Sequence, residues 1–248
     1  MNLESIVSGV IRTPLRVVLY GPEGVGKTSF AALAPTPIYI CSEKGTSHLN
    51  VARFPVPATW NDLFTGLNEL LTREHTFQTV VLDSADWFER LAGKAVAQEN
   101  GKDSIEGIGY GKGHVMLAEK FQQLLQWLDA LAEQRQMNVI IIAHSVIENF
   151  DDPTTESYSR YSLATGKKVT PLLKEWPDAL LFATFDKSMQ TTGDGFKERK
   201  IAKSYGDRIL LTEHRATHDA KNRWRLPERL PLDWQQFASC VDAYYQNT

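Results

Sequence analysis

The sequence has few cysteines, no long apolar run and no tract of biased composition. Its two cysteines, Cys41 and Cys240, lie far apart, so neither a disulfide framework nor a clustered metal site is expected. No stretch approaches the roughly 20 apolar residues needed to cross a bilayer, and the N-terminus lacks a basic start followed by an apolar core. We therefore expect a cytoplasmic protein without a membrane span.

Positive charge is also scarce, with 27 Lys and Arg against 30 Asp and Glu and a net charge of -3. This balance argues against a protein that is basic on every side, as a general nucleic-acid binder would be. The distribution is uneven, because residues 160–225 carry 14 Lys and Arg against 8 Asp and Glu. Two interpretations of this stretch stay open: an ordinary solvated face, or a polyanion-binding surface on one side of the molecule.

Strand and helix patterns alternate along the 248 residues, a length that suits one large domain. Short apolar, β-branched runs predict strands at residues 16–20, 37–43, 77–84, 138–145, 178–185 and 208–214. Helical spacing predicts helices at residues 27–34, 59–75, 86–96, 114–135, 171–175 and 231–245, with Thr59 as the N-cap of the second. The alternation predicts an α/β fold with a mostly parallel central sheet flanked by helices on both faces.

Three polar stretches interrupt this alternation. Residues 99–113 carry five glycines and break the helical pattern. The segment from Glu148 to Lys168 is polar and irregular, and we expect it to form a long mobile loop. Residues 190–200 resemble a hairpin turn between two strands.

A phosphate-binding motif follows the first predicted strand. The string Gly21-Pro22-Glu23-Gly24-Val25-Gly26-Lys27-Thr28 fits the Walker A pattern G-x-x-x-x-G-K-[ST], and Ser29 follows it at the start of a predicted helix. Glycines let successive backbone N–H groups converge on phosphates, and a helix N-terminus favours negative charge. Lys27 should reach the β- and γ-phosphates, and the Thr28 hydroxyl should be a Mg²⁺ ligand. The sequence therefore predicts that ATP and Mg²⁺ bind here.

Acidic residues end two of the predicted strands. Asp83 closes the run "TVVLD" and is the expected Walker B carboxylate that orients Mg²⁺. Ser84 follows it, where several P-loop motor families place a catalytic glutamate, so the general base must come from elsewhere. Glu43 is the candidate, because "IYICSE" puts it at the tip of the strand after the Walker A helix. An exposed loop glutamate without function is the alternative.

The strand "VIIIAH" presents His144 at its tip in the same way. If this strand lies between those that carry the Walker A loop and Asp83, His144 faces the γ-phosphate and can signal its loss to the following loop. A histidine packed at a strand end without function is the competing interpretation. The tryptophans prompt a simpler expectation: Trp60, Trp87 and Trp127 fall at helical positions that should pack on the sheet.

The order of "LYGPEGVGKTSF", "IYICSEKGT", "VVLDS" and "VIIIAHS" resembles the RecA-like core. With "GYGKG" and "DAKNRWRLPERLPLDW", the chain is similar to phage-encoded AAA-type ATP-binding proteins, which include the minimal RecA-like single-strand annealing proteins. This resemblance implies an N-terminal segment at 1–14, a RecA-like ATPase core at 15–230 without the extra N-terminal domain of full recombinases, and a C-terminal helix at 231–248.

The resemblance also implies roles for individual residues. Glu43 matches the glutamate that activates water, and His144 stands where relatives place a polar γ-phosphate sensor, often glutamine. Asn100 to Gly113 and Glu148 to Lys168 match the two DNA-binding loops of recombinases. Lys167 and Lys168 resemble lysines that enter the neighbouring subunit's ATP site, which implies a ring or filament.

Aromatic and basic residues interleave in the second of these loops, at Tyr158, Arg160, Tyr161, Lys167 and Lys168. Such groups stack on bases and pair with phosphates in proteins that bind single-stranded DNA. A further basic set is expected to line an electrostatic groove or an inter-subunit face: Arg208, Arg215, Lys221, Arg223 and Arg225.

We therefore expect an Mg²⁺-dependent ATPase that self-associates, binds single-stranded DNA and promotes annealing in the cytoplasm of a phage-infected or prophage-bearing bacterium. A single-strand-binding protein is the expected protein partner. Two alternatives stay open: a P-loop kinase for a small molecule or nucleotide, and a nucleotide-switched assembly factor for phage replication or packaging.

Overall fold

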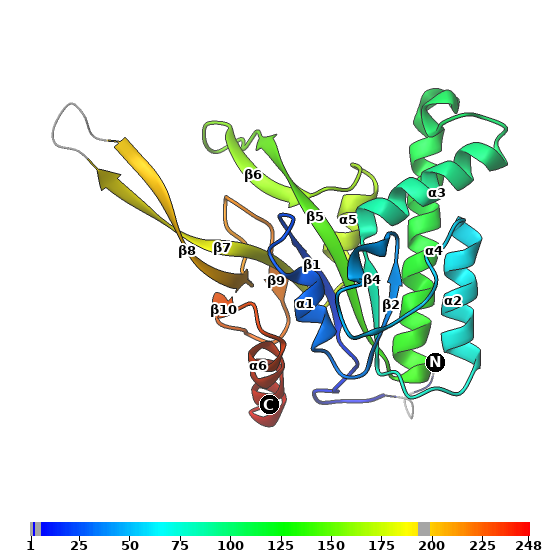
Figure 1. Ribbon diagram of the computed structural model, residues 1–248, viewed down its shortest axis with the longest axis horizontal. Helices are drawn as coiled ribbons and strands as arrows, with labels where there is room; N and C mark the ends of the chain where they lie inside the picture. Colours follow the sequence, from blue (N-terminus) through cyan, green and yellow to red (C-terminus); the bar gives the residue numbers. More distant parts are fainter. Residues whose placement is uncertain (1, 3–5, 193–198) are drawn as a thin grey trace.

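The computed structural model describes residues 2, 6–192 and 199–248, and within these a ten-stranded sheet runs through the molecule (Figure 1). Its parallel part has the order β7-β1-β5-β4-β2-β3. These strands are β1 (Arg16–Gly21), β2 (Pro37–Cys41), β3 (Ala52–Arg53), β4 (Thr79–Asp83), β5 (Asn138–Phe150) and β7 (Ala179–Thr192). The predicted position of the "VIIIAH" strand, between the Walker A and Walker B strands, is confirmed.

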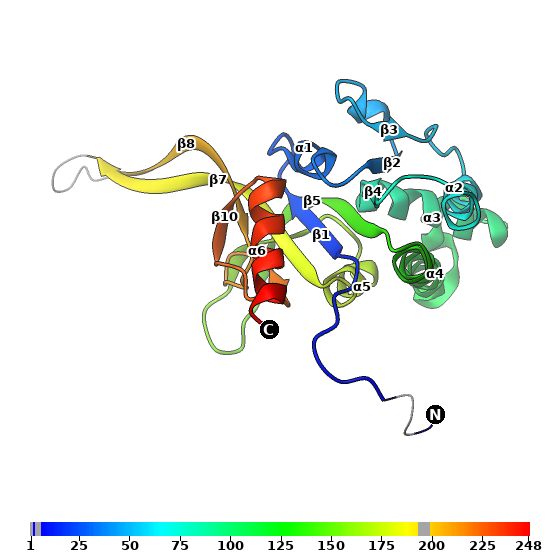
Figure 2. The same cartoon turned by 90° about the horizontal axis from the view of Figure 1, so that it is seen from below.

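Helices cover both faces of the sheet, because alternate residues of each strand point to opposite sides. On one face Val18 and Tyr20 pack beneath α2 (Trp60–Thr72), α3 (Ala85–Glu99), α4 (Lys112–Arg135) and α5 (Val169–Glu175). On the other face Val17 and Leu19 pack beneath α1 (Lys27–Ala32) and α6 (Trp234–Gln246), as the view in Figure 2 shows for α1. The predicted α/β class, with a mostly parallel sheet between two helical layers, is confirmed.

The local signals for two helices also match the structure. Thr59 caps α2 through a capping box, in which its hydroxyl accepts from the Asp62 N–H while the Asp62 carboxylate accepts from the Thr59 N–H. The glycine-rich stretch ends α3 at Glu99 and forms two short 3-10 turns, Ile105–Gly107 and Gly109–Gly111, before α4 begins. Gly113 is in close contact there, since a Cβ added to it would lie 2.3 Å from the Ile105 carbonyl oxygen.

The long irregular loop expected from Glu148 to Lys168 is wrong at its start and in its middle, where residues 148–150 and 158–163 lie in strands. Strand β5 continues to Phe150, turns, and returns as β6 (Tyr158–Leu163), with register from Ser145 opposite Leu163 to Phe150 opposite Tyr158. The sequence signal is weak because the outer part of this hairpin leaves the core, and the exposed residues 146–150 mix apolar and polar side chains without alternation. Only the turn at residues 151–157 and the segment after β6 lack regular strand structure.

A second hairpin projects from the far side of the sheet as a long arm, made of β7 and the antiparallel β8 (Arg199–Leu211) (Figure 1). The predicted turn at 190–200 falls at its outer end, and residues 193–198 lie outside the described residues. At its root the arm joins the main sheet, where β8 pairs with β10 (Arg229–Pro231) and β7 pairs with β9 (Lys221–Asn222) as well as β1. A register irregularity separates root from arm, between Phe185 and Lys187.

Candidate nucleotide-binding site

The predicted phosphate loop connects β1 to α1 at the carboxyl edge of the parallel strands. Gly24 and Gly26 have φ angles of 71° and 105°, which residues with a side chain rarely adopt, so glycine is required at both. Val25 between them is fully buried and anchors the loop on the core. The loop therefore has the fixed, glycine-dependent shape that phosphate binding by backbone N–H groups needs.

Lys27 is 5% exposed and folds back over this loop. Its Nζ donates hydrogen bonds to the carbonyl oxygens of Gly21, at 2.8 Å, and Pro22, at 2.9 Å. Burial lowers the pKa of Lys27 to about 8, although the nearby Asp83 and Asp86 act in the opposite direction. Phosphate oxygens would supply this ammonium with the negative partner that its surroundings provide only in part.

Thr28 and Asp83 lie in contact at the base of the same loop, although β5 separates the strands β1 and β4 that lead to them. The Thr28 hydroxyl donates to the Asp83 carboxylate at 2.7 Å, and the Tyr39 hydroxyl holds the Thr28 carbonyl at 2.9 Å. Burial raises the pKa of Asp83, opposed by the hydrogen bond from Thr28 and the charge of Lys27. Two hard oxygen donors side by side fit Mg²⁺, which takes few protein ligands and keeps water and phosphate oxygens as the others.

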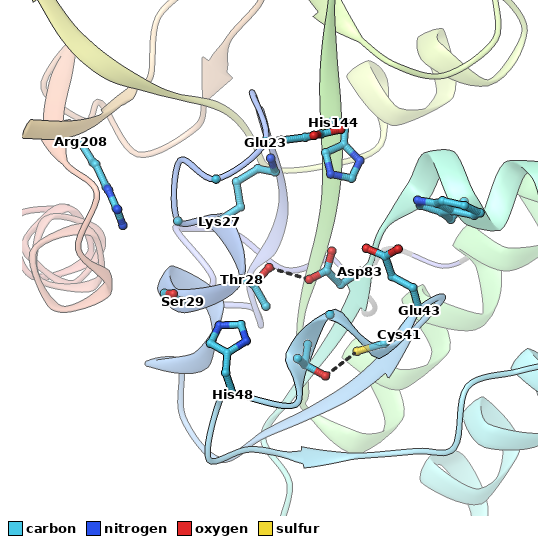
Figure 3. A pocket seen from close by; sticks show the side chains of 15 residues that line it. Glu23, Lys27, Thr28, Ser29, Cys41, Glu43, His48, Asp83, His144 and Arg208 are labelled. Atoms are coloured by element: carbon cyan, nitrogen blue, oxygen red, sulfur yellow. Dashed lines mark hydrogen bonds between the residues drawn. The ribbon is translucent and has the colours of Figure 1, made fainter. Parts of the chain in front are cut away.

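Glu43 is tied to the end of the Walker B strand through Ser42. The Ser42 hydroxyl donates to the Asp83 carbonyl at 3.1 Å and accepts from the Ser84 N–H at 3.2 Å, across a cis Asp83–Ser84 peptide bond. Glu43 itself is exposed and begins a short 3-10 turn, Lys44–Thr46. Its carboxylate faces the same cavity as Asp83 (Figure 3).

A cavity of about 530 Å³ brings most of the predicted site residues together. The predicted residues that line it are Glu23, Gly24, Gly26, Lys27, Thr28, Ser29, Glu43, Asp83 and His144. Of the other loop residues, Gly21 and Pro22 contribute the carbonyl groups that hold Lys27, and Val25 faces the core. One cavity thus holds the phosphate loop, the Glu43 and Asp83 carboxylates and the His144 imidazole.

His144 lies opposite Gly21, the last residue of β1, but not at a strand tip as expected, because β5 continues past it to Phe150. It also has a fixed partner that the sequence did not indicate. Its Nδ1–H donates to the Asp86 carboxylate at 3.0 Å, and its backbone N–H donates to the same carboxylate at 3.2 Å. The hydrogen bond to the Asp86 carboxylate raises the pKa of His144. Burial alone would raise the pKa of Asp86, but the hydrogen bonds and charge of His144 lower it. The pair therefore favours the charged forms of both groups, an imidazolium at His144 and a carboxylate at Asp86.

Trp87 and Arg208 also line the cavity, although the sequence did not predict either of them at the nucleotide site. Trp87 was expected in the core, yet it is 39% exposed and lines the cavity, because it lies on the side of α3 that faces away from the sheet. Trp60 is buried and Trp127 packs against the core, so those two expectations are confirmed. Arg208 also lines the cavity, although β8 enters it from a part of the chain far from any of the recognised motifs.

The residues expected to bind DNA do not form one surface. Arg160 is 5% exposed, pairs with Asp219, and lies 4.8 Å from the Phe150 ring centroid, while the Tyr161 ring packs on Phe182. The two residues are neighbours in β6 and point to opposite faces of the strand, and each side chain has a partner within the chain, so a contact of either with DNA would have to replace these contacts. Tyr158 is half-buried on the outer hairpin, and Lys167 and Lys168 are exposed. Neither lysine lines the nucleotide cavity of its own chain.

The basic set after Arg160 is likewise divided among separate partners. Arg215 pairs with Glu213 and Glu228, Arg223 with Asp178, and the Lys221 ammonium donates to the Glu175 carbonyl oxygen. Arg225 is exposed. These groups are not gathered into one groove, and the excess of positive charge is partly balanced by local ion pairs. No helix among the described residues is long and apolar enough to cross a membrane.

Known proteins share this arrangement in part. The AAA domain family matches residues 13–224. The SPbeta prophage-derived uncharacterized protein YorG of Bacillus subtilis (strain 168) is 29% identical over 105 residues, which make up 39% of this chain and 32% of that protein. The matched segment thus spans about a third of the prophage protein's length. The crystal structure of the RadB recombinase is similar with a TM-score of 0.48 and 16% identity, covering 90% of each chain.

Proposed function

The chain belongs to the AAA domain family of P-loop ATPases, and on that basis we propose that it binds ATP with Mg²⁺, hydrolyses it, and couples its nucleotide state to single-stranded DNA. One observation carries the enzymatic part of this proposal. Lys27, the Thr28–Asp83 pair and Glu43 surround a single cavity, so charge neutralisation, metal binding and water activation are available at one place.

Each residue has a distinct task in hydrolysis. Lys27 leaves its carbonyl partners and binds the β- and γ-phosphates. The negative phosphates stabilise the charged form of Lys27, which burial disfavours. Thr28 and Asp83 hold Mg²⁺, which when bound supplies positive charge against the phosphate oxygens. Glu43 accepts a proton from the attacking water, and His144, fixed by Asp86, donates toward the γ-phosphate oxygens.

Calorimetry with ATP, with and without Mg²⁺, tests the binding step, and release of phosphate tests turnover. We expect Mg²⁺-dependent binding that Lys27→Ala abolishes, with Arg73→Ala at the distant end of α2 as a matched loss of one positive charge. Binding that is the same in the wild type and Lys27→Ala would contradict the proposal.

Single-stranded DNA binding rests on the exposed groups at the carboxyl edge of the sheet. Lys167 and Lys168 are exposed after β6, Tyr158 lies on the outer hairpin, and Tyr110, fully exposed with a φ of 58°, stands in the glycine-rich stretch. Aromatic rings and ammonium groups are the chemistry that stacks on bases and pairs with phosphates. Annealing of complementary strands is the activity that the sequence resemblance adds.

Fluorescence anisotropy with a labelled single-stranded oligonucleotide tests this part. The double variant Lys167→Ala, Lys168→Ala should weaken binding at least tenfold and flatten its salt dependence. The control variant Arg73→Ala, Arg135→Ala removes the same charge from the opposite edge of the sheet, at the ends of α2 and α4, and should bind as the wild type does. No binding of the wild type at low salt, in any nucleotide state, would refute the DNA proposal.

Completion of the ATP site by a second copy is tested by mixing inactive subunits. Lys27→Ala subunits keep Lys167 and Lys168, whereas the double lysine variant keeps an intact phosphate loop. If Lys167 and Lys168 act in the neighbouring subunit's site, mixing the two variants creates some complete sites, and ATP turnover should reappear. A mixture as inactive as its components would show that these lysines do not act in trans.

The two alternatives predict different outcomes from the same measurements. A kinase would bind phosphates with several arginines, whereas Arg208 is the single arginine among the described residues that line the cavity. Stimulation of turnover by a small acceptor rather than by DNA would favour a kinase. Nucleotide binding without DNA binding would favour an assembly factor for phage replication or packaging.

A further inference from the structure

Arg208 approaches the phosphate loop from the side opposite the metal-binding carboxylate. Its Nη1 lies 2.9 Å from the point that a Cβ on Gly26 would occupy, so only a glycine lets the guanidinium come this close to the loop. Figure 3 shows Arg208 on one side of Lys27, with Asp83 and His144 on the other. All four side chains line the same cavity.

The course of β8 explains why Arg208 points here. Leu210, two residues further along the strand, is buried in the cluster that also contains Val25 and Phe30, so Arg208 faces the same side of the sheet as the phosphate loop. Between the pairs Phe185–Arg208 and Lys187–Ser204 the β8 strand has extra residues, including Gly206 with a φ of 82°. Such a bulge changes the direction of the strand and re-aims its side chains.

The backbone at Arg208 is fixed, while its side chain has no acidic partner among the described side chains. The Arg208 carbonyl accepts from the Leu232 N–H at 2.9 Å, which ties β8 to the segment before α6. Among the residues whose side chains the structure describes, none forms an ion pair with Arg208, whereas Arg215 and Arg229 each pair with a carboxylate. A guanidinium directed into a phosphate-type cavity without a counter-ion is suited to bind a phosphate oxygen pair.

We propose that Arg208 is a nucleotide-binding residue that contacts the α-phosphate end of the bound nucleotide and thereby attaches the root of the β7–β8 arm to it. The inference rests on the proposed ATP binding. Thr28, Asp83 and Glu43 lie on the side of the loop where the γ-phosphate would react. Arg208 and Ser29 lie on the opposite side, which would therefore receive the α-phosphate, the phosphate nearest the nucleoside. Arg208 then binds ATP and ADP alike.

The nucleotide would act on the arm through this contact. Residues 206–211 form the root of the arm, and the arm continues outward directly from them. A bound nucleotide holds Arg208 against the phosphate loop, so the root becomes more rigid when the cavity is filled. Release of the nucleotide removes the Arg208 contact and leaves the root with its sheet hydrogen bonds, the Leu232 contact and the packing of Leu210 in the core.

Titration calorimetry with ADP and with a non-hydrolysable ATP analogue tests the contact in four proteins: wild type, Arg208→Ala, Arg208→Lys and Arg73→Ala. We expect Arg208→Ala to weaken both ligands by a similar factor of about ten, as for the loss of a hydrogen bond between charged groups. Arg208→Lys should recover part of this loss, and Arg73→Ala should match the wild type. Thermal melting of each variant checks that it is folded.

Hydrogen exchange of the peptide that covers residues 206–211 provides the second measurement. ADP should slow exchange there in the wild type and have little effect in Arg208→Ala at saturating ligand. Unchanged affinity in Arg208→Ala while Lys27→Ala abolishes binding would overturn this inference and leave the proposed function intact. Loss of affinity for the ATP analogue alone would place Arg208 at the γ-phosphate and also overturn it. No binding by the wild type would refute both.

Discussion

The Thr28 hydroxyl donates a 2.7 Å hydrogen bond to the Asp83 carboxylate, although the two residues lie 55 positions apart in the chain. The contact joins the first turn of α1 to the tip of β4, and it spans β5, which lies between β1 and β4 in the sheet. Parallel strands end at one edge of the sheet, so the two oxygens meet where the phosphate loop opens. Both halves of the proposed metal site therefore lie side by side where the phosphate loop opens.

Asp83→Asn should separate metal binding from folding. The substitution keeps the size of the side chain and an oxygen that can accept from Thr28, and burial already disfavours the charge of Asp83, so stability should stay close to that of the wild type. ATP turnover should fall by a factor of about 100 or more. Turnover measured against Mg²⁺ concentration checks this, and an unchanged Mg²⁺ dependence would contradict the proposed role.

Glu43→Gln should abolish hydrolysis and preserve nucleotide binding. A positioned general base contributes roughly 100- to 10,000-fold to a rate, and the amide cannot accept the proton of the attacking water. Single-turnover hydrolysis and calorimetry measure the two effects separately. Glu23→Gln is the matched control, because Glu23 is an exposed glutamate that lines the same cavity and has no assigned catalytic role. Equal turnover in Glu43→Gln and the wild type would mean that Glu43 is an ordinary loop residue.

Trp87 should report on nucleotide binding through its fluorescence. It lines the cavity, is 39% exposed, and carries the Arg90 guanidinium 4.5 Å from its ring centroid, so a ligand changes both its solvent exposure and its electrostatic surroundings. We expect ADP to change the emission of the wild type and to leave that of Trp87→Phe nearly constant. Trp127→Phe, in which the cavity keeps its tryptophan, should retain the response. A full response in Trp87→Phe would show that another tryptophan is the reporter.

The His144–Asp86 pair should make stability depend on pH in a defined direction. The pKa of His144 is raised from 6.5, so its contribution is complete below about pH 6.5 and is lost as the pH rises through the raised value. The pKa of Asp86 is lowered from 3.8, so its contribution is present above about pH 4 and is lost as the pH falls through the lowered value. The pair stabilises most between these limits.

Urea unfolding of the nucleotide-free wild type and His144→Gln at pH 5.5 and pH 8.5 checks this expectation. Glutamine retains a donor but cannot become charged, so the wild type should have an advantage of about 1 kcal/mol at the lower pH and less at the higher. A difference between the two proteins that does not vary with pH would show that the charge of the pair contributes nothing.

Gly113→Ala should destabilise the protein without altering the chemistry of the cavity. A Cβ at this position would lie 2.3 Å from the Ile105 carbonyl oxygen, so the glycine-rich stretch must move away from α4. Such overpacking costs about 1–3 kcal/mol. Gly109→Ala, which meets no atom within 4 Å, is the control and should unfold at nearly the wild-type urea concentration. Equal stability of the two variants would show that the stretch adapts freely.

The parts of the site that follow from local rules could be predicted from the sequence. The phosphate loop needs consecutive residues of fixed type, and Glu43, Asp83 and His144 each close or follow an apolar run. Their convergence follows from the rule that parallel strands share a carboxyl edge. Thr59 is of the same kind, since a capping box involves residues only three apart.

The contacts that were missed join residues distant in sequence. Asp86 reaches His144 across 58 positions, and Arg208 approaches the loop from the root of the β7–β8 hairpin. The sequence predicts that Arg160 is free to bind DNA, because no residue near it in sequence indicates that Asp219 lies beside it. The β5–β6 hairpin gives no strand signal because the exposed residues 146–150 mix apolar and polar side chains without alternation. Contacts between distant segments, rather than local propensity, determine all of these.

The arm leaves the main sheet at one well-defined step. Beyond the pair Lys187–Ser204, the described backbone of β7 pairs with β8 alone, up to the pair Thr192–Arg199. A two-stranded ribbon is marginally stable in water by itself, so the order of this outer part depends on the root to which it is joined. Insertions and deletions there leave the hydrophobic core intact, and the length of the ribbon is thereby free to evolve independently of the ATPase.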